Sequence, residues 1–201
     1  MRTKITAFIF AIALTLVCGR ANATGFLVQP AVAFGSSLVP APSAVAGAMS
    51  TGEPTATFTL APIVRLGASL PWLAVALDFS YTAAGVIAQQ GDFTSSIVQV
   101  GVDFEPYVWR TRDRRARIYA LLAVNALALG HPSTGPDWGA GFTAGVGGNY
   151  FLHPAFAVGA ELAVKPQFVP LANNVLLVDT NVYVALTLTF ETGHHFVEPR
   201  P

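Results

Sequence analysis

Hydrophobic and polar side chains alternate with a period of two along much of the chain. The pattern is clearest from Asn181 to Phe190, where Val, Leu and Phe occupy one face and Asn, Tyr, Ala and Thr the other. The segment from Trp138 to Tyr150 repeats it, with Gly, Thr and Asn on the second face. Frequent glycine disfavours a helix, whereas a period of two is that of a β-strand. Both segments are therefore predicted to be strands.

Six further segments fit the same interpretation. Five of them place large apolar side chains at alternate positions, with polar or charged residues between them. The sixth, Arg117 to Leu129, is apolar on both faces with Asn125 as its only lumenal clue, and could be helical on its own. The eight predicted strands are Phe26–Phe34, Thr55–Gly67, Trp72–Ala84, Phe93–Val108, Arg117–Leu129, Trp138–Tyr150, Ala155–Phe168 and Asn181–Phe190. An even number of strands of about ten residues is typical of a transmembrane β-barrel.

The connections between these segments alternate in length. Gly35 to Pro54 is long and rich in Ser, Pro, Ala and Gly, whereas Ala68 to Pro71 is short. Longer connections follow at Ala84–Asp92, Gly130–Asp137 and Val169–Val175, and a tight one at Leu152–Pro154. Arg110 to Arg115 is the exception on the short side. The asymmetry predicts an amino terminus that starts in the periplasm and long loops that face outside.

The composition supports a membrane barrel over other classes. Apolar residues make up 53% of the chain and charged residues 11%, too little charge to cover the surface of a soluble domain easily. After the amino-terminal segment, the longest apolar run, Ile118 to Leu129, is too short for a transmembrane helix and is interrupted by Asn125. The chain also lacks the basic surplus of a nucleic-acid binder.

Residues 1–23 have the organisation of a cleaved signal peptide. Arg2 and Lys4 precede an apolar run that ends before the A-x-A sequence Ala21-Asn22-Ala23. Cleavage would leave a barrel domain at residues 24–190 and a polar tail at residues 191–201, without any cysteine. Lipid attachment at Cys18 is an alternative that the preceding Val17 disfavours. We expect export to the outer membrane.

The alternating segment from Asn181 to Phe190 resembles the last-strand signal of Gram-negative outer-membrane proteins. The mature chain resembles small eight-stranded barrels of the OmpA/OmpX-like superfamily. This resemblance implies an all-β, antiparallel up-and-down transmembrane barrel, with Tyr183 and Phe190 in an assembly signal that the barrel-assembly machinery recognises. The tail from Glu191 to Pro201 departs from the pattern, because the phenylalanine usually ends the chain. Members of the superfamily differ in function, so the resemblance indicates a location better than an activity.

Charged side chains fall on the predicted lumenal face. Strand direction places Arg65, Asp103 and Glu105 toward the periplasmic end. It places Asp78 and Glu161 near mid-height, and Lys165 above them. Ions in a dry interior must be paired or hydrated, and side chains can just fill an eight-stranded barrel. We therefore predict a polar network that plugs the lumen, with a proton or ion relay as the alternative.

Aromatic residues fall near the ends of the predicted strands. Amphipathic rings favour the headgroup level of a membrane, which predicts an aromatic girdle. Its expected members are Tyr81, Trp109, Tyr119, Trp138 and Tyr150, with Phe151 beside them. Aromatic residues also occur at strand ends in β-proteins that do not enter membranes.

Five arginines lie between Arg110 and Arg117. The simpler interpretation is a solvated turn that helps to fix the topology. The alternative is a site that attracts anionic lipid headgroups or another periplasmic polyanion.

The chain contains no convincing catalytic or metal motif. His131 and Ser133, two residues apart, invite comparison with lipid A deacylases, but they lie in a loop and only Asp137 is near in sequence. The other histidines, His153, His194 and His195, lack metal-ligand spacing. We expect no enzyme activity, cofactor or metal.

The expected function is that of a monomeric outer-membrane barrel with a filled lumen and a structural or surface-interaction role. Its expected partners are outer-membrane lipids, the barrel-assembly machinery and a surface ligand of the loops, but no nucleic acid. The alternatives are a lipid-modifying barrel enzyme and a soluble, lipocalin-like barrel whose apolar side chains face inward.

Overall fold

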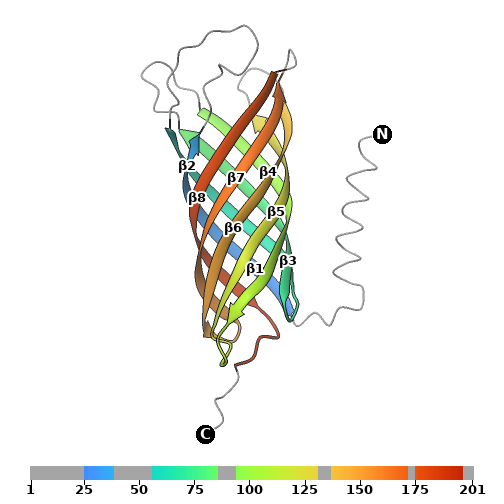
Figure 1. The fold of residues 1–201 in the computed structure, drawn as a ribbon, viewed down its shortest axis with the longest axis vertical. Coiled ribbons are helices and arrows are strands. Elements are labelled where there is room, and N and C mark those ends of the chain that lie inside the picture. Colours follow the sequence, from blue (N-terminus) through green and yellow to red (C-terminus); the bar gives the residue numbers. More distant parts are fainter. Residues whose placement is uncertain (1–24, 39–55, 86–93, 131–136, 172–174, 197–201) are drawn as a thin grey trace, which may run out of the picture.

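The computed structural model describes residues 25–38, 56–85, 94–130, 137–171 and 175–196. Its eight strands are β1 (Gly25–Leu38), β2 (Ala56–Ser69), β3 (Leu73–Gly85), β4 (Thr94–Arg110), β5 (Ala116–Gly130), β6 (Asp137–His153), β7 (Phe156–Leu171) and β8 (Val175–Glu191). Each strand pairs antiparallel with the next, and β1 pairs with β8, so the sheet closes into a barrel (Figure 1). The all-β, eight-stranded antiparallel barrel predicted from the sequence is confirmed. Within the described ranges, no helix is long and apolar enough to cross a membrane.

Each predicted strand coincides with one observed strand, and the observed strands generally extend further. The ambiguous segment from Arg117 to Leu129 lies in β5, which pairs with both β4 and β6 along its length. Neighbouring strands thus supply the backbone hydrogen bonds that a helix would have made internally. Strand β8 continues through Glu191, one residue past the predicted end of the barrel domain.

The two ends of the barrel differ. At one end, called the turn end here, short connections join β2 to β3, β4 to β5 and β6 to β7 (Figure 1). The strand register places Gly25 and Glu191 at the same end, since Gly25 lies opposite Ser69 and Glu191 opposite Leu27. Backbone hydrogen bonds close these turns, such as the 2.9 Å bond from Thr111 N to Ala116 O. The connections at the opposite end, called the far end, lie outside the described residues.

The outer wall is apolar, whereas the interior contains both polar and apolar side chains. Large apolar side chains on the outside of all eight strands expose between 36% and 70% of their surface, as Phe34, Phe79 and Leu186 do. Alternate side chains point inward and are buried, among them Gln29, Thr143 and Thr187. This arrangement is the reverse of the soluble, lipocalin-like alternative, in which the apolar face would line the interior.

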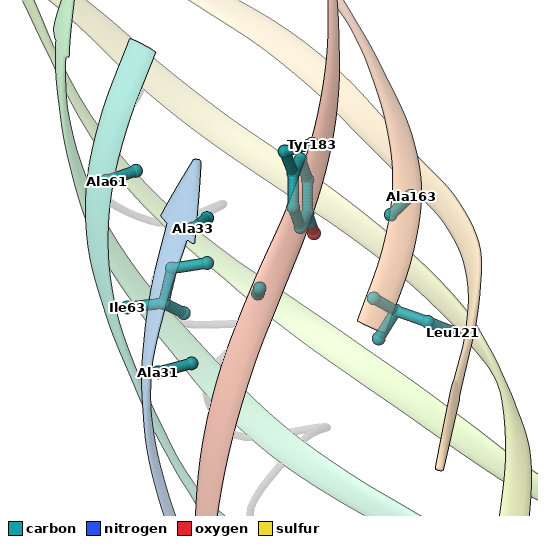
Figure 2. Close-up of a cluster of buried hydrophobic side chains, with 8 residues drawn as sticks. Ala31, Ala33, Ala61, Ile63, Leu121, Ala163 and Tyr183 are labelled. Carbon is teal, nitrogen blue, oxygen red and sulfur yellow. The ribbon is translucent and has the colours of Figure 1, made fainter. Parts of the chain in front are cut away.

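Part of the interior is a small apolar core. Figure 2 shows Ala31 and Ala33 of β1 and Ala61 and Ile63 of β2 inside the barrel, with Tyr183 of β8 near them. Leu121, Ala163 and Ala185 complete the cluster. Small residues on neighbouring strands leave room for a few large side chains, so the narrow interior can be filled.

Strand β6 contains a glycine, Gly147, that faces a crowded part of the interior. A Cβ atom added at Gly147 would overlap the ring of Tyr119, which comes from the neighbouring strand β5 and is fully buried. The next residue, Gly148, points outward, and a Cβ there would meet only the Arg117 carbonyl oxygen at 3.4 Å. Glycine at position 147 is thus what allows Tyr119 to lie inside the barrel.

Substitution of these two glycines should have unequal effects. Gly147→Ala should lower the free energy of unfolding by about 1–3 kcal/mol, because the added methyl group displaces the Tyr119 ring. Gly148→Ala, the matched control, should change it by less than about 0.5 kcal/mol. Equilibrium unfolding of the refolded protein in detergent micelles would measure both. Equal losses in the two variants would contradict the close approach of Tyr119.

Candidate functional site

The strongest concentration of charge inside the barrel surrounds Arg65 of β2, whose side chain is 1% exposed. Its Nε atom lies 2.6 Å from Asp103 Oδ2 and 3.4 Å from Asp78 Oδ2. Its two terminal nitrogens donate to Glu161, Nη1 to Oε1 at 2.6 Å and Nη2 to Oε2 at 3.0 Å. Glu105 Oε1 lies 4.0 Å from Nη1. One guanidinium therefore faces four carboxylates, and the pair with Glu161 has the bidentate geometry that arginine favours.

The strand register explains how these groups meet. Arg65 stands directly opposite Asp78 in the β2–β3 ladder. Two neutral side chains extend the contacts: Arg65 Nη1 donates to Gln29 Oε1 at 3.2 Å, and Tyr119 OH donates to Glu161 Oε1 at 2.7 Å. The Arg65 cluster, as we call it, consists of Gln29, Arg65, Asp78, Asp103, Glu105, Tyr119 and Glu161, and it joins β1, β2, β3, β4, β5 and β7 across the lumen.

A second polar group, the turn-end cluster, comprises Ser69, Tyr107, Arg117 and Glu191. Arg117 Nη1 lies 2.7 Å from Glu191 Oε2 and donates to Tyr107 OH at 3.1 Å. Ser69 Oγ donates to Glu191 Oε1 at 2.6 Å. Arg117 was predicted both as the first residue of a strand and as part of a basic run, and Glu191 as part of the tail. The structure has both residues in strands, with buried side chains. Both side chains point inward and satisfy one another's charge.

Lys165 lies toward the far end from the Arg65 cluster. Its Nζ atom donates to Gln99 Oε1 at 2.8 Å, an oxygen that Ser80 Oγ also approaches at 3.2 Å. Lys165 Nζ also lies 5.6 Å from the ring centroid of Tyr183. All six charged residues predicted for the lumen are buried there, and five of them share the Arg65 cluster while Lys165 bonds to an amide instead.

Buried acids outnumber buried bases in the described residues. The carboxylates are Asp78, Asp103, Glu105, Glu161, Asp179 and Glu191, and the cations are Arg65, Arg117 and Lys165. Arg65 is therefore shared, and neither oxygen of Glu105 has a hydrogen-bond partner within the described chain. In the same residues, no three His, Cys, Asp or Glu side chains are grouped so that they could hold a metal ion. The Arg65 cluster thus links several strands across the lumen by electrostatic interactions.

Four of the five residues predicted for an aromatic girdle are exposed near the ends of their strands. Tyr81 and Trp138 are exposed toward the far end, and Trp109 and Tyr150 toward the turn end. The prediction for Tyr119 is wrong. Its side chain is fully buried in the lumen, because Tyr119 shares the inward face of β5 with Arg117. Phe151, which was expected beside the girdle, is also fully buried, whereas the exposed Trp72 was not predicted. An irregularity in the β4–β5 pairing between Tyr107 and Trp109 accompanies the change of face between these two residues.

The tail returns across the turn end after β8. Thr192 Oγ1 accepts a hydrogen bond from Phe26 N at 2.8 Å, and Thr192 N donates to Phe26 O at 3.0 Å. His194 stacks on Phe151 with ring centroids 3.9 Å apart, and its Nε2 lies 2.9 Å from the Arg114 carbonyl oxygen. That carbonyl can only accept, so Nε2 carries the hydrogen. These contacts attach residues Thr192–Phe196 to the barrel.

The proposed assembly signal divides between the two faces of β8. Phe190 is exposed on the outer wall beside Phe156, at a centroid distance of 5.2 Å, whereas Tyr183 is buried inside. Recognition of these residues by assembly machinery remains a prediction. His131 and Ser133, considered as a catalytic pair, lie outside the described residues.

Several residues of the two clusters were missed, although strand parity could have identified them. Arg117 and Tyr119 are separated from Asn125 by even numbers of residues, so a continuous strand places all three on one face. Glu191 shares its face with Tyr183 in the same way. The absence of clear alternation in β5 concealed this relation, because its outer and inner residues are both mainly apolar.

The fold resembles those of solved outer-membrane proteins. The crystal structure of Neisserial surface protein A is 15% identical to this chain, covers 82% of it and 96% of its own chain, and gives a TM-score of 0.51. The outer-membrane protein OprG from Pseudomonas aeruginosa is 14% identical, with 83% of this chain and 95% of that chain covered and a TM-score of 0.47. No family model and no curated protein matches the chain. The similarity concerns the fold of a small eight-stranded barrel.

Removal of either side of the central ion pair should destabilise the protein. Arg65→Ala and Glu161→Ala should each cost about 3–5 kcal/mol in the free energy of unfolding, because each leaves buried charge without its partner. Lys165→Met should cost less than half as much, since Lys165 Nζ bonds to an amide oxygen. Urea titrations in micelles would compare the three variants. Unchanged stability in both Arg65→Ala and Glu161→Ala would contradict a plug held by this pair.

The contact of the tail should depend on pH. Burial lowers the pKa of His194 below its ordinary value of 6.5, although the hydrogen bond to the Arg114 carbonyl opposes the shift. Protonation then favours the detached tail, so the contact is complete above pH 6.5 and is lost as the pH falls through the lowered pKa. Hydrogen exchange at Thr192 N, corrected for intrinsic rates, should report this loss. His194→Gln should remove the pH dependence and His195→Gln should retain it; equal profiles in all three proteins would refute the role of His194.

Proposed function

We propose that this chain, which has the fold of small eight-stranded outer-membrane barrels, spans the outer membrane with a filled lumen and serves a structural or surface-interaction role in the cell envelope. The observation that carries the proposal is the apolar outer wall, which extends around all eight strands. A soluble protein would expose that surface to water, at a cost of roughly 25 cal/mol for each Å² of apolar area. Hydrocarbon removes this cost.

The closed pairing of the backbone also suits a hydrocarbon environment. Because β1 pairs with β8, each strand has two neighbours and the barrel has no free edge. A bilayer core offers no water to satisfy an unpaired N–H or C=O group, so closure is required there. The exposed aromatic residues Tyr81 and Trp138 at one level and Trp109 and Tyr150 at the other fit the two headgroup regions of one membrane.

The filled interior favours a role at the ends of the barrel over passage through it. At the level of the Arg65 cluster, Arg65, Glu105 and Glu161 are at most 2% exposed. Arg65 and Glu161 are bonded to each other, and all three residues have little contact with solvent. We therefore assign interaction to the barrel ends, and to the lumen the task of holding the strands in place.

The membrane assignment predicts heat-modifiable migration in gels. The mature protein from a purified outer-membrane fraction should migrate differently in SDS before and after boiling, because a closed barrel resists SDS until it is heated. Arg65→Ala should lose the compact band at a lower temperature than the wild type.

Fractionation provides the control. The wild-type protein should remain with the outer membrane after washing with high salt, which removes proteins bound by charge alone. Recovery of a soluble periplasmic protein without a mobility shift would overturn the proposed function.

A further inference from the structure

The connection between β4 and β5 concentrates exposed positive charge at the turn end. Arg112 and Arg114 are exposed and have no ion-pair partner among the described residues, and Arg115 is 51% exposed. The acid within this turn, Asp113, lies 3.8 Å from Arg115 and accepts a hydrogen bond from the Arg115 amide. We call residues 110–115 the arginine turn; it carries four arginines against one aspartate.

The rest of the arginine turn is held in a defined shape. Arg110 donates to the Pro71 carbonyl oxygen of the neighbouring connection, and its guanidinium lies 4.2 Å from the ring centroid of Tyr107. Thr111 and Ala116 exchange backbone and side-chain hydrogen bonds across the base of the turn. Arg114 itself adopts a φ of 61°, and its amide donates to Thr111 O at 3.0 Å. Arg112 and Arg114 are thus presented from a closed hairpin.

The position of the turn relative to the outer wall identifies the surface it meets. Trp109, which is half exposed on that wall, immediately precedes Arg110. The exposed Trp72 lies in the adjacent connection, and its carbonyl oxygen accepts a hydrogen bond from Tyr107 N. Indole rings favour the boundary between hydrocarbon and headgroups. One residue of strand advances about 3.3 Å, so the arginines begin at the level of the lipid phosphates.

We propose that the arginine turn binds the anionic headgroups of the phospholipid leaflet at the turn end, with Arg112 and Arg114 as its main contacts. This proposal rests on the proposed function, because it requires a barrel that spans a membrane. Charge complementarity supports a phosphate partner, and continuity with the tryptophans of the outer wall favours a lipid over a soluble polyanion. Binding would fix the depth of the turn end and enrich acidic lipid around it.

Reconstitution with two lipids tests the proposal. The mature protein is refolded into vesicles that contain equal amounts of phosphatidylcholine and phosphatidylglycerol, and spin-labelled forms of each lipid report their relative affinity for the barrel surface. We expect the wild type to favour phosphatidylglycerol at low salt. Arg112→Gln combined with Arg114→Gln should lower this preference by roughly fivefold for each charge removed. High salt should also lower it in the wild type.

A variant that makes the arginine turn more positive separates the effect of charge from the effect of damage to the fold. Asp113→Asn keeps a side-chain oxygen to accept from the Arg115 amide but removes the negative charge, so it should raise the preference. Each variant should retain the heat-dependent mobility shift. A variant that fails to refold is replaced by the corresponding single substitution, Arg112→Gln, which lies outside the closing hydrogen bonds.

Two results would overturn the proposal. In the first, the inserted wild-type barrel shows equal affinity for the two lipids. In the second, the double variant keeps the wild-type preference. Equal affinity together with sedimentation on purified peptidoglycan through the same arginines would identify a polyanion as the partner instead. If the wild type does not insert at all, the proposed function fails first, and the mobility assay records that outcome separately.

Discussion

Closure of the sheet is the constraint on which the other features of this protein depend. The β1–β8 ladder extends from Leu27 opposite Glu191 to Leu38 opposite Thr180, nearly the full length of β1. A barrel with one unpaired edge would expose N–H and C=O groups, and in hydrocarbon each such group costs several kcal/mol. Closure removes that cost and allows the outer wall to be apolar throughout. It also fixes how little space remains inside, because eight strands enclose a lumen that side chains can fill.

The narrow lumen determines which residues can occupy it. Alanine and glycine are needed where large groups such as Tyr119 and Tyr183 cross the interior, and Gly147 is the sharpest example. Buried charged groups need a partner: the shared Arg65 provides one for Asp103 and Glu161, and Lys165 donates to the Gln99 amide oxygen. Packing and electrostatics are therefore coupled, since Tyr119 both fills the space above Gly147 and donates to Glu161.

Much of this architecture could be predicted from the sequence because alternation identifies both the strand and its inward face. That reasoning placed Arg65, Asp78, Asp103, Glu105, Glu161 and Lys165 inside, where the structure has them. It did not identify their partners, since contacts across the lumen depend on how far each strand is shifted along its neighbour. It also misassigned Tyr119, because position near a strand end was given more weight than the parity shared with Asn125. Arg117 was obscured for a related reason: its charge was grouped with a neighbouring turn, although its face belongs to the lumen.

Alternation alone leaves the register of the barrel undetermined. A strand that slips by two residues keeps its apolar face outward, so the hydrophobic pattern cannot distinguish the two arrangements. Such a slip of β2 against β3 would move Arg65 about 7 Å along its neighbour and away from Asp78, which now lies directly opposite. It would leave buried charge unpaired and would cost several kcal/mol of stability, although the apolar side chains of the outer wall would still face outward. Arg65 thus contributes what the apolar face cannot supply: contacts with β3, β4 and β7 that exist together in one register only.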